Sequence, residues 1–219
     1  MFTVAIDGPS GSGKSTAARR CAQLLSAHYL DTGAMYRAAA AACIAANVDP
    51  NDAKVVERFI EEMDLVISTD PAPPRVRVNG VDVSDQIRRP EVAIWTKALS
   101  TDPLCRANMV VRQQAIIADG NFVVEGRDIT TVVAPKAQVR VLLTADEAVR
   151  MARRGAEQGT ESASDNLVAQ IADRDRADST LVNFTVAADG VVTIDSTDLT
   201  IDQVVAAIMD LAHQAGLAR

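Results

Sequence analysis

Apolar positions along the chain follow two patterns, short β-favouring runs and longer stretches with helical spacing. The first run, residues 2–6, ends in the turn Asp7-Gly8-Pro9, and apolar residues then recur at helical spacing from 14 to 27. Strands alternating with helices predict a parallel α/β sheet covered by helices on both faces. Further strands are expected at 29–30, 121–125, 139–143 and 191–195, and further helices at 34–46, 52–63, 90–99, 103–118, 145–158, 164–177 and 200–215.

The middle of the chain has a different pattern. Valines at 76, 78, 81 and 83 flank Asn79-Gly80, a dipeptide typical of tight β-hairpin turns. Residues 65–67 can supply a third strand. We therefore expect a small antiparallel sheet, separate from the main parallel sheet.

Composition narrows the class of protein. The 219 residues are 48% hydrophobic and 23% charged, as in ordinary globular domains. A net charge of −7 argues against a general nucleic-acid binder, which needs a basic surface. The three cysteines lie in apolar helical patterns without metal-ligand spacing, which predicts buried free thiols. No signal peptide or membrane span is recognisable, so we expect a cytoplasmic protein without membrane contact.

One motif carries clear chemistry. Residues 8–15 read Gly-Pro-Ser-Gly-Ser-Gly-Lys-Ser and fit the P-loop pattern G-x-x-x-x-G-K-[ST], with a strand before it and a helix after it. Gly11 and Gly13 allow positive φ and a close approach of the backbone to phosphate. Lys14 can reach the β- and γ-phosphates, and the Ser15 hydroxyl can bind Mg²⁺. The motif predicts a nucleoside triphosphate binder, but no particular reaction.

Three classes remain open at this point: a small-molecule kinase, a GTPase switch and a non-catalytic nucleotide-binding module. A GTPase would carry N-K-x-D and D-x-x-G, and neither occurs in the chain. A kinase also binds a phosphate acceptor, which calls for arginines far from the P-loop in sequence. Arg127 follows a predicted strand, where parallel sheets bind ligands. Arg150, Arg153 and Arg154 share one predicted helix.

Several segments together resemble the bacterial cytidylate kinase family, which phosphorylates CMP and dCMP with ATP. The resemblance rests on residues 6–16, 30–37, 80–88, 125–133, 174–175 and 178–180. The most specific stretches are Asp-Thr-Gly-Ala-Met-Tyr-Arg at 31–37 and Gly-Arg-Asp-Ile at 126–129. It implies a single P-loop kinase domain spanning 1–219. Its parts would be a core (1–31, 107–149 and 166–219), an insert that binds the nucleoside monophosphate (32–106) and a short lid (150–165).

The resemblance also assigns roles to residues. The CMP phosphate would be held by Thr32, Arg37 and Arg127 with Tyr36 beside them, the base by Arg106 and Asp128, and the ribose by Arg174 and Asp178. Asp128 has another reading from the sequence, as the cap of a helix that opens at Ile129. Phosphoryl transfer would depend on Lys14, Arg127, Arg153 and Arg154. ATP would be bound by Gly8, Pro9, Ser10, Gly11, Ser12, Gly13, Lys14, Ser15 and Thr16, with Mg²⁺ on Ser15.

Two positions depart from the family pattern. Leu181 stands where the family commonly has an arginine that touches the substrate phosphate, and Lys97 stands where the family often has a base-contacting serine. We expect ATP and CMP or dCMP as partners, no nucleic acid, and a monomer. The alternatives are a kinase for another monophosphate or a small alcohol, and a nucleotide-dependent regulator that uses the same pocket.

Overall fold

The computed structural model describes residues 1–72, 75–157 and 186–217. The chain divides into two compact units, which we call the loop unit (residues 1–29 and 120–219) and the helical unit (residues 30–119). Among the described residues, no helix combines the length and the apolar character that a membrane span requires.

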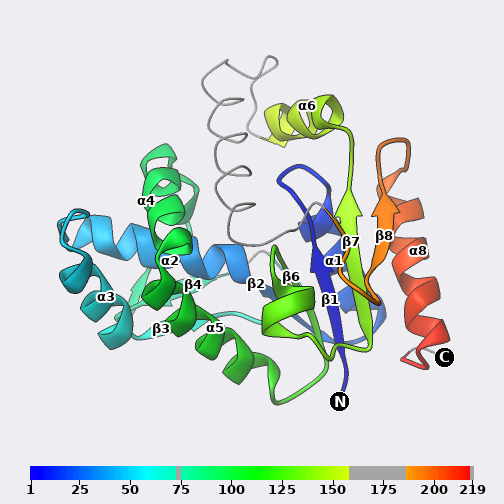
Figure 1. Ribbon diagram of the computed structural model, residues 1–219, viewed down its shortest axis with the longest axis horizontal. Coiled ribbons are helices and arrows are strands. Elements are labelled where there is room, and N and C mark those ends of the chain that lie inside the picture. Colours follow the sequence, from blue (N-terminus) through cyan, green and yellow to red (C-terminus); the bar gives the residue numbers. More distant parts are fainter. Residues whose placement is uncertain (73–74, 158–185, 218–219) are drawn as a thin grey trace. The chain divides into compact units, whose positions relative to one another are not determined.

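The loop unit is built on a five-stranded sheet with the order β2-β6-β1-β7-β8 (Figure 1). The pairs β1–β6, β1–β7 and β7–β8 are parallel, which confirms the predicted sheet. Val4, Ala5 and Ile6 are fully buried in its central strand, as an apolar run in a two-sided parallel sheet should be. The strands are β1 (Thr3–Asp7), β2 (His28–Asp31), β6 (Phe122–Gly126), β7 (Val139–Thr144) and β8 (Val192–Asp195).

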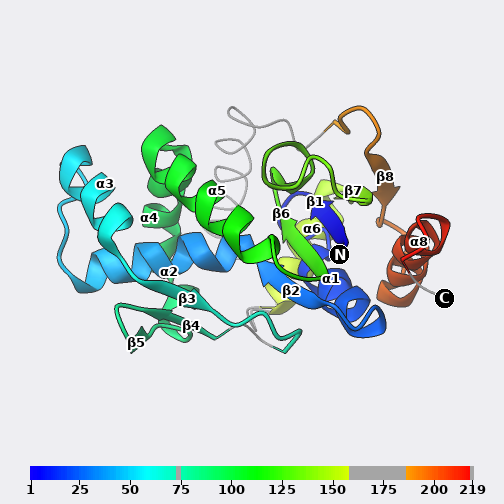
Figure 2. The same cartoon turned by 90° about the horizontal axis from the view of Figure 1, so that it is seen from below.

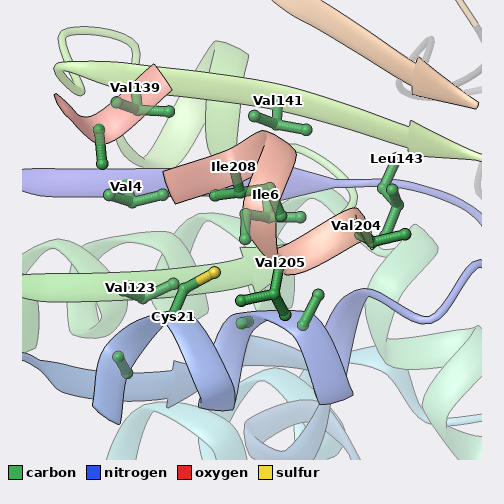
Figure 3. Close-up of a cluster of buried hydrophobic side chains, with 14 of the residues drawn as sticks. Val4, Ile6, Cys21, Val123, Val139, Val141, Leu143, Val204, Val205 and Ile208 are labelled. Atoms are coloured by element: carbon green, nitrogen blue, oxygen red, sulfur yellow. The ribbon is translucent and has the colours of Figure 1, made fainter. Parts of the chain in front are cut away.

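One face of this sheet holds the main hydrophobic core. Alternate residues of β1 and β7, among them Ile6 and Val141, pack there against two helices. Figure 3 shows Ile208 beside Ile6, with Val205 and Cys21 nearby. Burial raises the pKa of the Cys21 thiol to about 12, so this cysteine is an inert core residue. The helices of the unit are α1 (Lys14–Leu24), α6 (Glu147–Glu157) and α8 (Ile201–Gln214).

The opposite face of the sheet contacts a short π-helical turn, η2 (Ile129–Val133), which is separated from the end of β6 by two residues. Asp7 lies on this face because it is one residue beyond Ile6 and side chains alternate along a strand. The turn therefore begins close to the end of β1, where the P-loop motif starts.

The helical unit is organised around α2, whose side chains at 38–42 are all buried alanines. Such a helix is apolar on all sides, so it belongs at the centre of a unit. It packs against the other helices and against the small sheet β3-β4-β5 (Figure 2). The elements are α2 (Thr32–Ala45), α3 (Ala53–Glu62), β3 (Leu65–Ile67), β4 (Val76–Val78), β5 (Val81–Asp82), η1 (Gln86–Arg88), α4 (Pro90–Thr101) and α5 (Pro103–Ile117).

Local sequence signals account for most element ends in this unit. Asn79 and Gly80 have positive φ, at 50° and 78°, and connect β4 to β5 as the hairpin motif predicted. The Asp52 side chain accepts a hydrogen bond from the Val55 backbone N–H and caps α3. The described residues contain the free, buried cysteines Cys21, Cys43 and Cys105, as expected.

Candidate active site

The phosphate loop lies between β1 and α1, and its glycines have the conformations that the motif requires. Gly11 and Gly13 have φ of 79° and 88°, which side chains rarely adopt. A Cβ at Gly11 would lie 2.4 Å from the backbone oxygen of Arg150, so the loop also packs tightly against α6. Gly13 directly precedes α1, whose N-terminal N–H groups favour an anion.

Lys14 and Ser15 occupy the first turn of α1. The Lys14 Nζ donates to the backbone oxygen of Pro9 at 3.2 Å, so its ammonium group lies over the loop. The Ser15 Oγ donates to Glu125 Oε1 at 2.6 Å, and the Tyr29 hydroxyl donates to the same carboxylate oxygen at 3.3 Å. Glu125 is buried at 3% exposure near the end of β6. A hydroxyl and a buried carboxylate thus lie together at the start of α1.

Arg127 and Asp128 follow the last residue of β6. Asp7 pairs in register with Gly126, so the phosphate loop and the Arg127–Asp128 segment leave neighbouring strands at the same edge of the sheet. This is the edge at which open parallel sheets bind ligands. Both side chains are partly exposed there.

The alternative role of Asp128 as a helix cap is wrong. Its side chain makes no capping hydrogen bond to η2. The backbone N–H groups of Ile129 and Thr130 donate instead to the Asp7 carboxylate. The carboxylate of Asp7, at the end of β1, therefore caps η2 in place of Asp128.

The arginines of α6 lie beside the phosphate loop. Arg150 Nη1 donates to the backbone oxygen of Ser10 at 3.1 Å. Arg153 donates to the Oγ of Ser196 at 3.0 Å and to its backbone oxygen at 2.8 Å. The Ser196 Oγ in turn donates to the backbone oxygen of Ser12 at 3.1 Å. Arg153 is thus tied to the phosphate loop through Ser196, and Arg154 follows on the same helix.

In the helical unit, the residues assigned to CMP phosphate lie at the start of α2. The Asp31 side chain caps this helix by accepting from the Ala34 N–H at 2.8 Å, and its Oδ2 pairs with Arg37 Nη2 at 3.0 Å. A Cβ at Gly33 would lie 2.9 Å from Arg37 Nη1, so glycine leaves room for the guanidinium. Thr32 and Tyr36 belong to the same first turns.

The remaining assigned residues are Arg106, Arg174 and Asp178. Arg106 lies in the first turn of α5, which Asp102 caps through two backbone N–H groups. Arg174 and Asp178, together with Leu181, lie outside the described residues. The site-building residues to which the sequence reasoning gave no role are Asp7, Asp31 and Ser196. Arg150 is expected from the sequence on the arginine-bearing helix, but without a stated role. A buried acidic residue at the end of an apolar strand was a usable signal for Asp7, whereas nothing in the sequence marked Ser196.

The arrangement is suited to phosphate chemistry. A glycine loop at a helix N-terminus, a lysine over that loop and several arginines gather donors and positive charge. Parallel sheet and loop together define a P-loop nucleotide-binding protein.

Comparison with known proteins identifies the family. The family model described as cytidylate kinase matches residues 4–214. Cytidylate kinases from Cutibacterium acnes and Nocardia farcinica are 44% and 42% identical to this chain, covering 96% and 93% of it and 95% and 90% of their own lengths. That of Geobacillus kaustophilus is 38% identical and covers 97% of both chains. The chain belongs to the cytidylate kinase family, and it is a nucleoside monophosphate kinase.

Proposed function

We propose that this kinase performs the reaction of its family with the residues placed above. The γ-phosphoryl group of ATP passes to CMP or dCMP, which gives ADP and CDP or dCDP. The observation that carries the proposal is the phosphate loop, which shares one sheet edge with Arg127 and Asp128. In-line transfer needs positioning and neutralised charge more than a covalent intermediate.

The loop unit is assigned to ATP and to the transfer step. Residues 8–16 bind the phosphates, chiefly through the backbone N–H groups of the residues other than Pro9. The Lys14 ammonium neutralises charge that develops between the β- and γ-phosphates. Arg153 and Arg154, on the helix beside the loop, would contribute positive charge to the transfer. In support, Arg153 makes two hydrogen bonds to Ser196, and its guanidinium has five N–H donors, so donors remain for phosphate oxygens.

Magnesium is the expected metal, and the donor set fits it. The Ser15 hydroxyl lies against the Glu125 carboxylate, and both are the hard oxygen ligands that Mg²⁺ prefers. The described residues contain no cluster of three or more acidic, histidine or cysteine side chains that could hold an ion alone. In kinase sites Mg²⁺ is typically held by one or two protein oxygens together with the substrate phosphates. Bound there, Mg²⁺ would offset the charge of the transferring phosphoryl group.

The acceptor is assigned to the residues that the resemblance indicates. Arg127, Arg37 and Thr32 are proposed to bind the CMP phosphate, with Tyr36 beside them, and Arg174 and Asp178 the ribose. Asp128 and Arg106 are proposed to recognise cytosine, because its N4 amine donates while N3 and O2 accept. The helical unit at 30–119 would include the nucleotide-binding insert at 32–106, and the lid would begin on α6. We further infer a cytoplasmic monomer.

A coupled assay of ADP release tests the function. CMP, dCMP, UMP, AMP, GMP and shikimate would be offered separately with ATP and Mg²⁺. We expect turnover with CMP and dCMP and at least ~10²-fold lower kcat/KM with UMP, because uracil reverses the donor and acceptor at two positions. Preferred use of AMP, GMP or shikimate would contradict the proposed acceptor. ADP release with none of them would favour a regulator.

A further inference from the structure

Asp7 is a buried carboxylate to which the reaction as proposed gives no role. It is only 3% exposed and it ends a strand in which Val4, Ala5 and Ile6 are fully buried. It also directly precedes Gly8, the first residue of the phosphate loop. A buried carboxylate is unfavourable unless its oxygens are satisfied by hydrogen bonds. The partners of Asp7 therefore indicate why it is there.

The side-chain hydrogen bonds of Asp7 go to the start of η2. Its Oδ1 accepts from the Ile129 N–H at 2.8 Å. Its Oδ2 accepts from the Thr130 N–H at 2.8 Å and from the Thr130 hydroxyl at 2.6 Å. Two consecutive backbone N–H groups are thus held by one side chain at the end of β1. The segment held in this way begins one residue after Asp128.

This connection has a geometric consequence for the site. Asp7 is joined covalently to the phosphate loop and by hydrogen bonds to the turn after Arg127 and Asp128. Gly126, in register with Asp7, fixes the other end of the Arg127–Asp128 pair. These two residues are therefore held on both sides, and both supports lead back to β1.

We propose that Asp7 is a positioning residue for the acceptor, fixing the Arg127–Asp128 segment relative to the phosphate loop. This inference rests on the proposed roles of Arg127 and Asp128 in binding CMP. Asp7 itself touches no reacting atom. Its removal should therefore affect the use of CMP much more than the binding of ATP.

The protonation of Asp7 provides a second readout. Burial raises its pKa to about 6, while the hydrogen bonds from Thr130 and Ile129 act in the opposite direction. Asp128 on the adjoining segment is a charged neighbour that also raises this pKa. Gly126 of β6 and Leu142 of β7, which are in register with Asp7, are uncharged.

The small cavity beside Asp7 adds no further charge. It is lined by Thr130, Thr131 and Leu142, and by apolar residues at 186–188 and 191. Once protonated, the carboxyl group has a proton on one oxygen and can no longer accept all three hydrogen bonds. The positioning effect should therefore weaken as the pH falls through about 6.

Steady-state kinetics of three variants test the proposal at a pH of about 7.5, above the pKa of Asp7. Asp7→Asn retains one acceptor oxygen and places an NH₂ group against a backbone N–H. We expect kcat/KM for CMP to fall about 20-fold, because small misplacements of binding groups are costly, while KM for ATP changes less than about threefold. Thr130→Val removes one hydroxyl and should cost a few-fold. Asp210→Asn, an exposed site on α8, should match the wild type.

The pH profile separates positioning from simple stabilisation. The phosphate of CMP also titrates near pH 6, so the ratio of wild-type to Asp7→Asn kcat/KM is the quantity to follow. This ratio should fall as the pH is lowered from about 8 to about 5, because the amide in the Asp7→Asn variant cannot titrate. Thr130→Val removes a hydrogen bond that lowers the pKa of Asp7. In this variant the acid limb of the pH profile, meaning the fall of kcat/KM at low pH, should therefore move to higher pH.

Several outcomes would overturn the proposal. Equal losses for ATP and CMP would make Asp7 an anchor of the phosphate loop alone, and a pH-independent ratio would exclude a role for its charge. If Asp7→Asn does not fold, the shift of the acid limb in Thr130→Val decides. Wild-type turnover of CMP tests the proposed function separately. If CMP is not a substrate, the variants are compared on the acceptor that the wild type uses.

Discussion

The two units fix the groups that we propose to bind phosphate in different ways. In the loop unit the phosphate site is made mainly of backbone, with Gly11 and Gly13 at positive φ and Gly13 at the entry to α1. In the helical unit it depends on a side-chain pair, Asp31 with Arg37, at the start of α2. A backbone site is set by the fold itself, whereas a side-chain site needs a partner that restrains each charged group.

The difference teaches where sequence change should be tolerated. Gly11 of the loop has no substitute, because a Cβ there would collide with the α6 backbone. In the helical unit a substitution can remove charge and leave the backbone unchanged, because Asp31 both caps the helix and restrains Arg37. Single side-chain substitutions that keep the hydrogen bonds to the backbone should therefore change substrate binding without changing the stability of the fold.

The largest effect is expected for the one cation within the phosphate loop. Lys14→Ala should reduce kcat at least ~10³-fold, because the variant loses charge stabilisation in the transition state while the backbone loop is retained. Steady-state kinetics and a thermal melt would measure both properties. Lys136→Ala, at an exposed position, is the matched control. Normal turnover in a folded Lys14→Ala enzyme would contradict the proposed mechanism.

Arg127 comes next, because it is assigned to the acceptor phosphate and Leu181 supplies no charge. Arg127→Ala should lower kcat/KM for CMP by at least ~100-fold, about 2.7 kcal/mol. The exposed Arg58→Ala, which breaks only a surface pair with Glu62, should leave the kinetics unchanged. An active Arg127→Ala variant would remove this segment from the acceptor site. Arg176 stands two positions after Arg174 in the sequence, and we test it as a replacement for the family arginine that is absent at Leu181. Arg176→Ala should cost little, and a severe loss would mean that Arg176 takes over that role.

The next prediction concerns base recognition, measured as the ratio of kcat/KM for CMP to kcat/KM for UMP. Asp128→Asn replaces an acceptor by an amide that can also donate, so discrimination against the carbonyl that uracil has in place of the cytosine N4 amine should weaken. We expect the preference for CMP over UMP in kcat/KM to narrow about tenfold, within the usual value of one hydrogen bond to a charged group. Competition between the two substrates measures the ratio directly. An unchanged ratio would exclude Asp128 from base recognition.

The sequence predicted the backbone of the site much better than its side-chain connections. The phosphate loop, the parallel strands, the hairpin at Asn79-Gly80 and the Asp52 cap all follow local rules that act over a few residues. The bonds from Asp7 to Ile129 and from Ser196 to Ser12 join residues that lie 122 and 184 positions apart in the sequence. Such pairs depend on strand order and register, which no local pattern specifies.

The pair in the helical unit allows a smaller and more selective test. Asp31→Asn keeps an oxygen that can cap α2 but removes the charge beside Arg37. We expect KM for CMP to rise about fivefold with little change in stability, since a partly exposed ion pair contributes about 1 kcal/mol. Asp52→Asn is the matched control, because Asp52 caps α3 in the same way. If both variants raise KM for CMP equally, the effect comes from helix capping and not from the ion pair with Arg37.

The smallest expected effect is on stability, and it concerns the carboxylate that joins β1 to η2. The pKa of Asp7 is raised from 3.8 to about 6 in the folded chain, chiefly by burial. The folded chain therefore binds this proton at a higher pH than the unfolded chain does. The resulting stabilisation is complete below pH 3.8 and is lost as the pH rises through about 6.

The Asp7→Asn variant has no titratable group at this position. Relative to this variant, the wild type should therefore gain about 1 kcal/mol of unfolding free energy as the pH is lowered from about 7 to about 5. Urea unfolding of both proteins at several pH values measures the difference. A difference that does not vary with pH would mean that the pKa of Asp7 is not raised. With the pKa raised, the stability of the wild type and its use of the acceptor should change in opposite directions with pH. The reason is that protonation of Asp7 stabilises the fold but weakens the hydrogen bonds that hold the Arg127–Asp128 segment.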